Sequence, residues 1–179
     1  PVCEAAAEYW QTGVPAIICS KGIEQESCEL MSEVVGEMLP GKPLAVLSGP
    51  AFAAEVAGDL PTAVTLACDD ETMAKVLMEF LSARFFRIYR SRDVIGTQIG
   101  GAVKNVLAIA CGIVEGRKLG DNARAALVTR GLAEITRLGI AKGAQAETLY
   151  GLSGLGDLTL TCNAMQSRNF SLGVALGQG

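Results

Sequence analysis

Histidine does not occur anywhere in the 179 residues. Its absence excludes hydrolases built on a Ser-His-Asp or Cys-His arrangement, excludes most zinc enzymes, and removes imidazole as a general base. Any acid–base chemistry in this protein must therefore come from a lysine or a carboxylate. We expect no metal site.

Paired cysteines are also missing, because none of the six cysteines forms a C-x-x-C pair. Isolated thiols within apolar stretches are typical of small core residues in a reducing cytosol. We expect that role here, and a cytoplasmic protein, in preference to disulfides or metal ligation. The six are Cys3, Cys19, Cys28, Cys68, Cys111 and Cys162.

Positive charge is scarce, since 15 Lys and Arg face 19 Asp and Glu and leave a net charge of −4. This balance argues against a nucleic-acid surface, although a few local cations can still hold a small anion. Half of the residues are hydrophobic and 19% are charged, which indicates a folded globular chain. No apolar run approaches the length needed to cross a bilayer and no signal peptide is visible, so we expect no membrane span.

The length leaves room for one domain or for pieces of two. The chain begins at Pro1 without a methionine and ends at Gly177-Gln178-Gly179, directly after a helical pattern. We interpret both ends as truncations of a longer protein.

In the first half, short apolar runs alternate with helical spacing, and this alternation predicts a largely parallel α/β sheet. A cap at Ser27 is expected to begin the second helix. The expected strands are 14–19, 44–47, 63–68 and 85–89, and the expected helices are 2–9, 30–38, a short one after 50, and 71–81.

From Asp93 onward the pattern contains helices and glycine-rich turns but no strand. A long helix is expected over 94–114, and a second over 122–138 that ends at Gly139. The predicted fold is therefore α/β followed by all-α, with the boundary near 91–93. The apolar stripe of the long helix is Ile99, Val103, Val106, Ala110 and Ile113.

Lys104 has surroundings that are unusual for a lysine on a solvated helix face. Its neighbours one and two turns away are small, and the adjacent pair Gly100-Gly101 costs about 1 kcal/mol per glycine relative to alanine. Something is therefore expected to approach this face closely, either a substrate or another helix. The alternative is a tight helix crossing from which Lys104 extends to solvent, and the pattern alone does not separate the two.

Two loops follow directly on expected strands, Ser20-Lys21-Gly22 and Ser48-Gly49-Pro50. Ligands of open α/β sheets bind at the carboxyl ends of the strands, so both loops are candidates for a crevice. Each is equally consistent with an ordinary turn from strand to helix.

Two further segments carry polar side chains. The stretch Gly151–Asp157 is not a dinucleotide fingerprint, because no strand precedes it, and we interpret it as a flexible turn that carries Asp157. Ser167-Arg168-Asn169 precedes a helical run, 170–176, and a helix N-terminus with an arginine is suited to binding an anion. A solvated arginine, with the asparagine as helix cap, is the alternative.

Five motifs, taken in order and with their spacing, resemble the bacterial NAD(P)-dependent glycerol-3-phosphate dehydrogenases over nearly the whole chain. The resemblance implies a two-domain enzyme. Residues 1–92 would be part of a doubly wound, Rossmann-like nucleotide-binding domain, and 93–179 part of a helical substrate-binding and catalytic domain. The motifs are Lys21-Gly22, Ser48-Gly49-Pro50-Ala51-Phe52-Ala53, Gly101-Ala102-Val103-Lys104-Asn105-Val106, Gly154-Leu155-Gly156-Asp157-Leu158 and Ser167-Arg168-Asn169.

The same resemblance implies the site residues. Lys104 would be the catalytic proton acceptor, and Lys21, Ala53 and Arg168 would contact NAD or NADP. Position 51 is alanine where many members have a hydroxyl residue, so a contact there would use the backbone. The first strand and the glycine-rich pyrophosphate loop of the family are absent from this sequence. The implied substrate contacts are Lys21, Gly49, Ala51, Asp157, Ser167, Arg168 and Asn169.

The implied reaction interconverts sn-glycerol 3-phosphate and dihydroxyacetone phosphate and feeds glycerophospholipid synthesis. The implied partners are a small phosphate substrate and a second copy in a homodimer. Two alternatives stay open. One is a dehydrogenase of similar architecture for a hydroxy or keto acid, and the other is a non-catalytic fragment that dimerises through the glycine face around Lys104.

Overall fold

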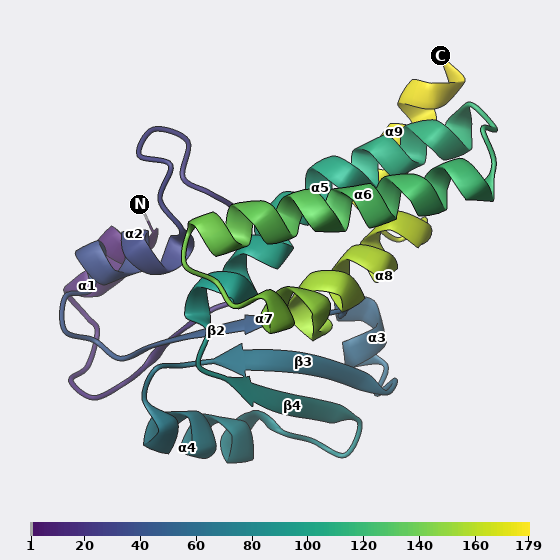
Figure 1. Cartoon of the computed structure of the whole chain (residues 1–179). Coiled ribbons are helices and arrows are strands. Elements are labelled where there is room, and N and C mark those ends of the chain that lie inside the picture. The colour runs from purple at the N-terminus through teal and green to yellow at the C-terminus, as the bar shows by residue number, and fades with distance from the viewer. Residues whose placement is uncertain (1) are drawn as a thin grey trace.

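A computed structural model describes residues 2–179 as a four-stranded sheet joined to a set of helices (Figure 1). The sheet part alternates strands and helices as expected. Its elements are α1 (Val2–Ala7), β1 (Ala16–Ile18), α2 (Met31–Met38), β2 (Leu44–Ser48), α3 (Ala53–Ala57), β3 (Thr62–Ala67), α4 (Glu71–Leu81) and β4 (Phe86–Ser91).

The strands lie in the order β1-β2-β3-β4. β1 pairs with β2 in parallel and β3 with β4 in parallel, but β2 and β3 are antiparallel. The expectation of a largely parallel sheet was therefore wrong for the central pair. The connection between β2 and β3 contains only the five-residue α3, which lies near one end of the sheet, so the chain turns back instead of crossing over (Figure 1).

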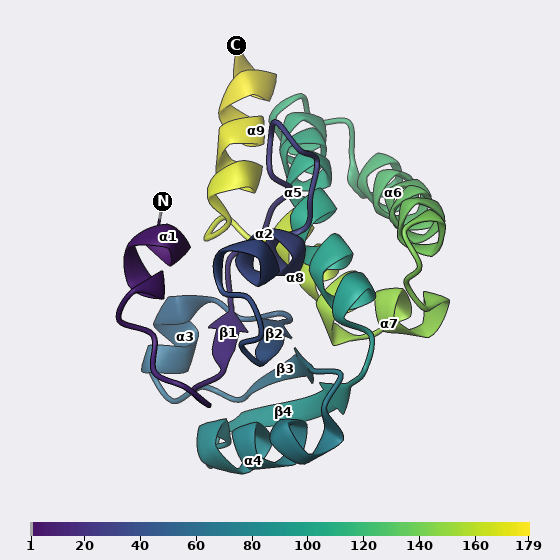
Figure 2. The same ribbon diagram turned by 90° about the vertical axis from the view of Figure 1, so that its left-hand side faces the viewer.

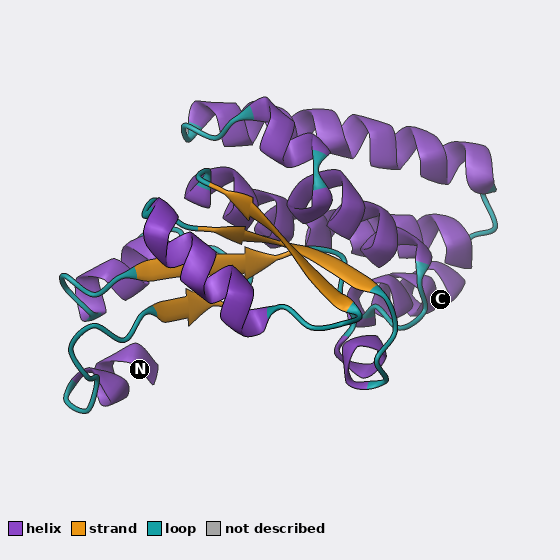
Figure 3. Ribbon diagram, turned by 90° about the horizontal axis from the view of Figure 1, so that it is seen from below, coloured by secondary structure: helices purple, strands orange, loops and turns teal. Residues whose placement is uncertain are grey.

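Alternate residues of the strands face two separate cores. Val64, Leu66 and Ile88 pack on one face against α4, whereas Ile18 and Val46 pack on the other against α2. Figure 3 views the sheet from below, with α4 lying across the strands in front. Ser48, two residues after Val46, consequently points to the α2 side. On that side the helical part of the molecule also contacts β2.

From residue 94 to 178 the chain forms helices joined by short turns, and among residues 2–179 no strand follows β4. The expected class, α/β followed by all-α, is confirmed. The long α5 is central and packs against α6, α8 and α9 (Figure 2). The elements are α5 (Val94–Gly116), α6 (Asp121–Ala141), α7 (Ala146–Tyr150), the π-helical turn η1 (Leu152–Gly156), α8 (Asp157–Asn163) and α9 (Arg168–Gln178).

The buried face of α5 differs from the expected apolar stripe. Ile99 is buried, but Val106 is 68% exposed, and the small residues around Lys104 form the most buried face. Neighbouring elements approach so closely that glycine and alanine fit where valine and isoleucine do not.

α5 is an exception to the expectation that no apolar run approaches the length needed to cross a bilayer. It has 23 residues and is long and apolar enough to cross a membrane by length and composition. However, it packs against α6, α7, α8, α9 and the sheet, and it buries the polar side chains Gln98 and Lys104. These contacts are typical of a core helix.

Three local expectations were wrong. α2 begins at Met31 with Leu30 as its N-cap, because the Ser27 hydroxyl instead donates to the Glu24 carboxylate at 2.9 Å. α6 continues past Gly139 to Ala141, and it is Gly143 that adopts a left-handed conformation, with φ at 97°. The segment interpreted as a flexible turn is η1, which leads directly into α8.

All six cysteines are free thiols, and Cys3 is half-buried against the core between the sheet and α2. Cys68, Cys111 and Cys162 are buried, whereas Cys19 and Cys28 are exposed, so the expected core role was wrong for these two. Contact with Cys111 and burial raise the pKa of the Cys162 thiol, which therefore stays protonated.

Candidate active site

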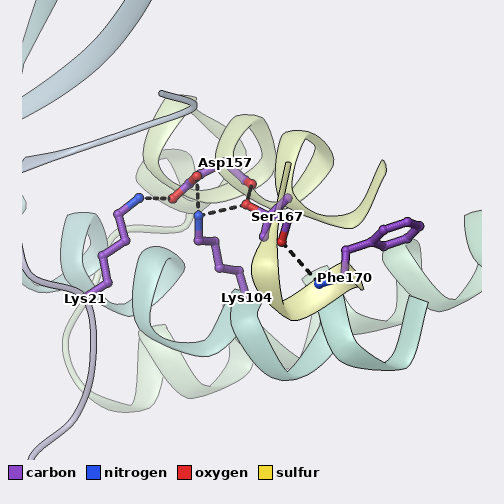
Figure 4. Close-up of polar contacts among 6 residues, drawn as sticks. Lys21, Lys104, Asp157, Ser167 and Phe170 are labelled. Atoms are coloured by element: carbon purple, nitrogen blue, oxygen red, sulfur yellow. Dashed lines mark hydrogen bonds and ion pairs between the residues drawn. The ribbon is translucent and has the colours of Figure 1, made fainter. Parts of the chain in front are cut away.

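Lys104 is buried and hydrogen-bonded to an acid that lies 53 positions later in the chain. Its Nζ lies 2.5 Å from Asp157 Oδ1, and the two side chains are 9% and 2% exposed. The other carboxylate oxygen, Oδ2, accepts from Lys21 Nζ, also at 2.5 Å (Figure 4). Three residues that sequence reasoning had singled out therefore meet at one carboxylate, and Lys104 does not extend to solvent.

These three residues come from three different elements. Lys21 follows β1, Lys104 lies midway along α5, and Asp157 begins α8 directly after η1. Two ammonium groups and one carboxylate leave a local excess of positive charge. Because this charge is largely buried, water screens it weakly, and the arrangement suits an anionic ligand.

Burial lowers the pKa of Lys104 below its ordinary value. The nearby Asp157 carboxylate opposes this effect, and the positive charge of Lys21 adds to it. The neutral amine of Lys104 is thus more accessible near neutral pH than that of a solvated lysine. A lysine in this state can accept a proton, and its ammonium form can return one.

Thr161 is a member of the site that sequence reasoning missed. Its hydroxyl accepts from Lys104 Nζ at 2.8 Å and donates to the backbone carbonyl of Asp157 at 2.7 Å. Asp157 and Thr161 are four residues apart on α8, so they lie on one face of the helix. This four-residue spacing is the feature of the sequence that could have identified Thr161 as a neighbour of Asp157.

The glycines of α5 explain how the neighbouring segments approach so closely. A Cβ added at Gly100 would overlap the carbonyl oxygen of Ser153 in η1. A Cβ at Gly101 would lie 3.1 Å from both Lys21 Cδ and Ser48 Oγ. The sequence predicted a close approach to these glycines, and parts of the protein itself make it. η1 approaches Gly100, and the aliphatic stem of Lys21 approaches Gly101.

A cavity of about 530 Å³ opens beside Lys21, at the carboxyl ends of β1 and β2. The two loops expected at a crevice both line it, since Lys21, Gly49 and Ala51 are among its wall residues, together with Ala53. Gly49 is held against β3, because a Cβ there would lie 2.9 Å from Val64 Cα. The cavity has a mostly apolar lining with one cation at its edge.

The segment Ser167-Arg168-Asn169 forms the start of α9. Ser167, not Asn169, is the N-cap, and its Oγ accepts from the Phe170 N–H at 3.3 Å (Figure 4). Arg168 is exposed, and in residues 2–179 no ion pair involves it. Neither Arg168 nor Asn169 lines the cavity or joins the contacts of Asp157.

The fold and this site together define the class: a ligand-binding α/β protein with an attached helical unit. A Rossmann-type α/β sheet meets a helical unit, and the polar side chains of both gather at the carboxyl ends of the strands, where sheets of this type bind their ligands.

Comparison with known proteins narrows the class to one family. The family model described as the NAD-dependent glycerol-3-phosphate dehydrogenase N-terminus matches residues 1–74, and the model for the C-terminus of the same family matches 93–179. The chain therefore belongs to the NAD-dependent glycerol-3-phosphate dehydrogenase family.

Individual relatives agree with this assignment. Over 179 residues the chain is 66% identical to glycerol-3-phosphate dehydrogenase (NAD(P)+) of Rhodospirillum rubrum, and over 178 residues it is 62% identical to that of Parvibaculum lavamentivorans. It covers 51% and 54% of these relatives, while the matches cover 100% and 99% of the chain. The chain thus spans about half the length of the curated relatives it matches.

Solved structures give the same picture. A glycerol-3-phosphate dehydrogenase from Coxiella burnetii superimposes with a TM-score of 0.95 at 48% identity, over 99% of this chain and 55% of that one. The enzyme from Saccharomyces cerevisiae gives a TM-score of 0.88 at 32% identity, over 99% and 54%.

Proposed function

We propose that this chain carries the catalytic centre of an NAD(P)-dependent glycerol-3-phosphate dehydrogenase, which interconverts sn-glycerol 3-phosphate and dihydroxyacetone phosphate. The observation that carries the proposal is the buried Lys104, held by Asp157 and Thr161 in a chain of this family. The printed names of the relatives give the reaction, and the contacts of Lys104 supply a group that can perform its proton transfer.

Lys104 is the proposed proton acceptor. When glycerol 3-phosphate is oxidised, its secondary hydroxyl must lose a proton as hydride leaves the same carbon. The neutral amine of Lys104 takes this proton, and in the reverse direction the ammonium form protonates the ketone oxygen. Thr161 and Asp157 fix the direction in which Nζ points.

Lys21 has two proposed tasks. Its positive charge helps to lower the pKa of Lys104, which favours the neutral amine. Its position at the edge of the cavity also places a cation where a negatively charged substrate enters. Gly49 and Ala51, which line the same cavity, would contact the substrate through the backbone.

The start of α9 is the proposed phosphate site. α9 has 11 residues, its first backbone N–H groups point toward its N-terminus, and Arg168 and Asn169 stand in its first turn. The exposed Arg168 side chain is free to move to a phosphate, with which guanidinium forms bidentate hydrogen bonds. Ser167, which caps the helix, holds this turn in place.

The cavity also fits the nicotinamide end of NAD or NADP, which would supply or accept the hydride when bound. Its volume of about 530 Å³ and its small wall residues leave space for a flat ring beside Lys21. Ala53 lies in the wall, and with Lys21 and Arg168 it would contact the cofactor.

The proposal extends to the organisation and setting of the enzyme. Residues 1–92 would be part of the nucleotide-binding domain and 93–179 part of the helical substrate domain. The enzyme would act in the cytoplasm as a homodimer, and its product would enter glycerophospholipid synthesis. These statements rest on the family alone.

The test is a chimera, here named the completed enzyme, in which this chain replaces the matched stretch of the Rhodospirillum rubrum relative. We expect NADH- or NADPH-dependent reduction of dihydroxyacetone phosphate and little reduction of keto acids of similar size. The parent enzyme is the control. An inactive chimera that folds beside an active parent would refute the proposal, and a preference for keto acids would support the rival dehydrogenase.

A further inference from the structure

A buried hydroxyl without a partner lies beside Lys21. Ser48 is the last residue of β2 and is 5% exposed, and among residues 2–179 no group hydrogen-bonds to its Oγ. Buried hydroxyls are normally paired, because leaving one unpaired costs free energy. A serine in this state that also lines a cavity is a candidate for a position at which a bound ligand completes the hydrogen bonding.

Three segments converge on Ser48. Its Oγ lies beside the Lys21 stem and against α5 at Gly101, one turn before Lys104. Ser48 also lines the cavity, and among residues 2–179 the other polar wall side chains are Lys21 and the Cys19 thiol.

The position of Ser48 selects one end of the substrate. In Figure 4 the start of α9, at Ser167, and Lys21 lie on opposite sides of Lys104. A triose phosphate with its reacting carbon at Lys104 and its phosphate at α9 therefore extends its other end toward Lys21 and Ser48. That end is a primary hydroxyl, which can both donate and accept a hydrogen bond, as the Ser48 Oγ can.

We propose that Ser48 determines specificity by hydrogen-bonding to the unphosphorylated terminal hydroxyl of the substrate. This inference rests on the proposed function, and it adds a residue that recognises one substrate group. An enzyme site that hydrogen-bonds to a hydroxyl rejects an analogue that lacks it, because the site's own polar group is then left unpaired.

The test compares dihydroxyacetone phosphate with hydroxyacetone phosphate, which has a methyl group in place of the terminal hydroxymethyl group and so lacks the terminal hydroxyl. In the completed enzyme we expect kcat/KM to favour dihydroxyacetone phosphate, and Ser48→Ala to reduce this preference by about fivefold to tenfold, the value of one neutral hydrogen bond. The KM for NADH and the melting temperature of the free enzyme should stay unchanged, because the hydroxyl has no partner to lose.

Ser153→Ala is the matched control. Ser153 is also buried, at 1% exposure, and its hydroxyl also lacks a partner in residues 2–179, but it does not line the cavity. This variant should keep the wild-type preference between the two substrates.

Each contrary result has a distinct meaning. An active completed enzyme whose substrate preference survives Ser48→Ala overturns the Ser48 contact and leaves the proposed function standing. A raised KM for NADH with unchanged substrate preference does the same, and assigns Ser48 to the cofactor. A completed enzyme that folds but is inactive, beside an active parent, overturns the proposed function and this contact with it.

Discussion

The ammonium group of Lys104 shares one carboxylate with Lys21, and this sharing sets its chemistry. A buried lysine paired one-to-one with a carboxylate is held in its charged form, whereas a second cation on the same carboxylate weakens that hold. In this chain burial and Lys21 outweigh Asp157, and the pKa of Lys104 falls. The ionic contacts therefore hold the Lys104 side chain in one orientation, but they leave it able to gain and lose its proton.

Replacing Lys104 tests its role as the base. In the completed enzyme, Lys104→Met should lower kcat by about 10²-fold or more, since a positioned general base contributes about 10²- to 10⁴-fold. Methionine has similar length and volume, so packing on α5 is kept. Lys104→Arg should not restore activity, because the guanidinium stays protonated. Steady-state rates with thermal melts measure both effects, and an active arginine variant would show that the base lies elsewhere.

The pH dependence of kcat tests the influence of Lys21. In glycerol 3-phosphate oxidation kcat should rise with pH as Lys104 loses its proton. The positive charge of Lys21 lowers the pKa of Lys104, so Lys21→Met should raise that pKa and move the rise in kcat to higher pH. Dihydroxyacetone phosphate reduction needs the ammonium form, so its fall at high pH should move in the same direction.

Lys75→Met is the control for this experiment. Lys75 is exposed on α4 and pairs with Glu71 on the same helix, outside the contacts of Lys104. Its loss removes the same charge from the protein but should leave the pH profile in place. An equal shift in both variants would mean that overall charge, and not the contact at Asp157, sets the pKa of Lys104.

The sequence indicated some of these residues and not others, for physical reasons. Lys104 stood out because small neighbours are unusual around a surface lysine. Thr161 offers only its four-residue spacing from Asp157, and a threonine on a helix is ordinary until the fold brings α5 beside α8. The sharing of Asp157 between two lysines from distant segments also depends on tertiary contacts.

At the scale of elements, glycines set the distance between α5 and α9. Gly112 and Gly173 face each other, and a Cβ added at Gly173 would lie 2.9 Å from Gly112 Cα. The two backbones are therefore nearly in contact where the helices cross. Because α5 carries Lys104 and α9 begins at Arg168, this crossing also sets how far the Lys104 amine lies from the proposed phosphate site.

Gly112→Ala should destabilise the fold. Its Cβ would overlap the Phe170 carbonyl oxygen, and backbone cannot move aside as a side chain can. Overpacking of this kind costs about 1–3 kcal/mol. Gly36→Ala is the matched control on α2, where the nearest atom, Leu44 Cδ1, lies at 3.8 Å, and alanine should stabilise that helix by up to about 1 kcal/mol. Urea unfolding of both variants measures the difference, and equal effects would contradict the close crossing.

The elements themselves were well predicted wherever a short-range pattern determines them. Continuous apolar runs marked β1, β2 and β3, and Asp70 caps α4 as its sequence suggests. The direction of β3 relative to β2 was not predictable in this way, because it depends on the path of the connection through α3. The end of α6 was missed because glycine within a helix is tolerated where a neighbour, here Leu149, packs against it.

Across the whole molecule, polar side chains at the start of α5 fasten this helix both to the other helices and to the sheet part. Asp93 caps α5, accepting from the Gly96 N–H at 2.7 Å, and also accepts from the Gln145 N–H at 2.8 Å. Gln98 on α5 accepts from the Ser32 N–H at 2.9 Å and donates to its hydroxyl at 2.7 Å. These contacts tie the first turns of α5, the helix that carries Lys104, to α2 and to the segment before α7.

Cofactor binding by the 179 residues alone depends on which contacts they contain. Pyrophosphate is normally held by a glycine-rich G-x-G-x-x-G loop between a strand and a helix, and no such sequence occurs here. Each charge-assisted hydrogen bond to a phosphate is worth about 1.5–3 kcal/mol, so losing two or more of them weakens binding by about a thousandfold. We expect the isolated chain to bind NADH with a Kd of about 1 mM or weaker, and the completed enzyme to bind it with micromolar affinity. Calorimetric titration of both, with circular dichroism to show that the isolated chain is folded, measures this difference. Micromolar binding by the folded isolated chain would mean that the cavity beside Lys21, and not a pyrophosphate loop, provides most of the affinity.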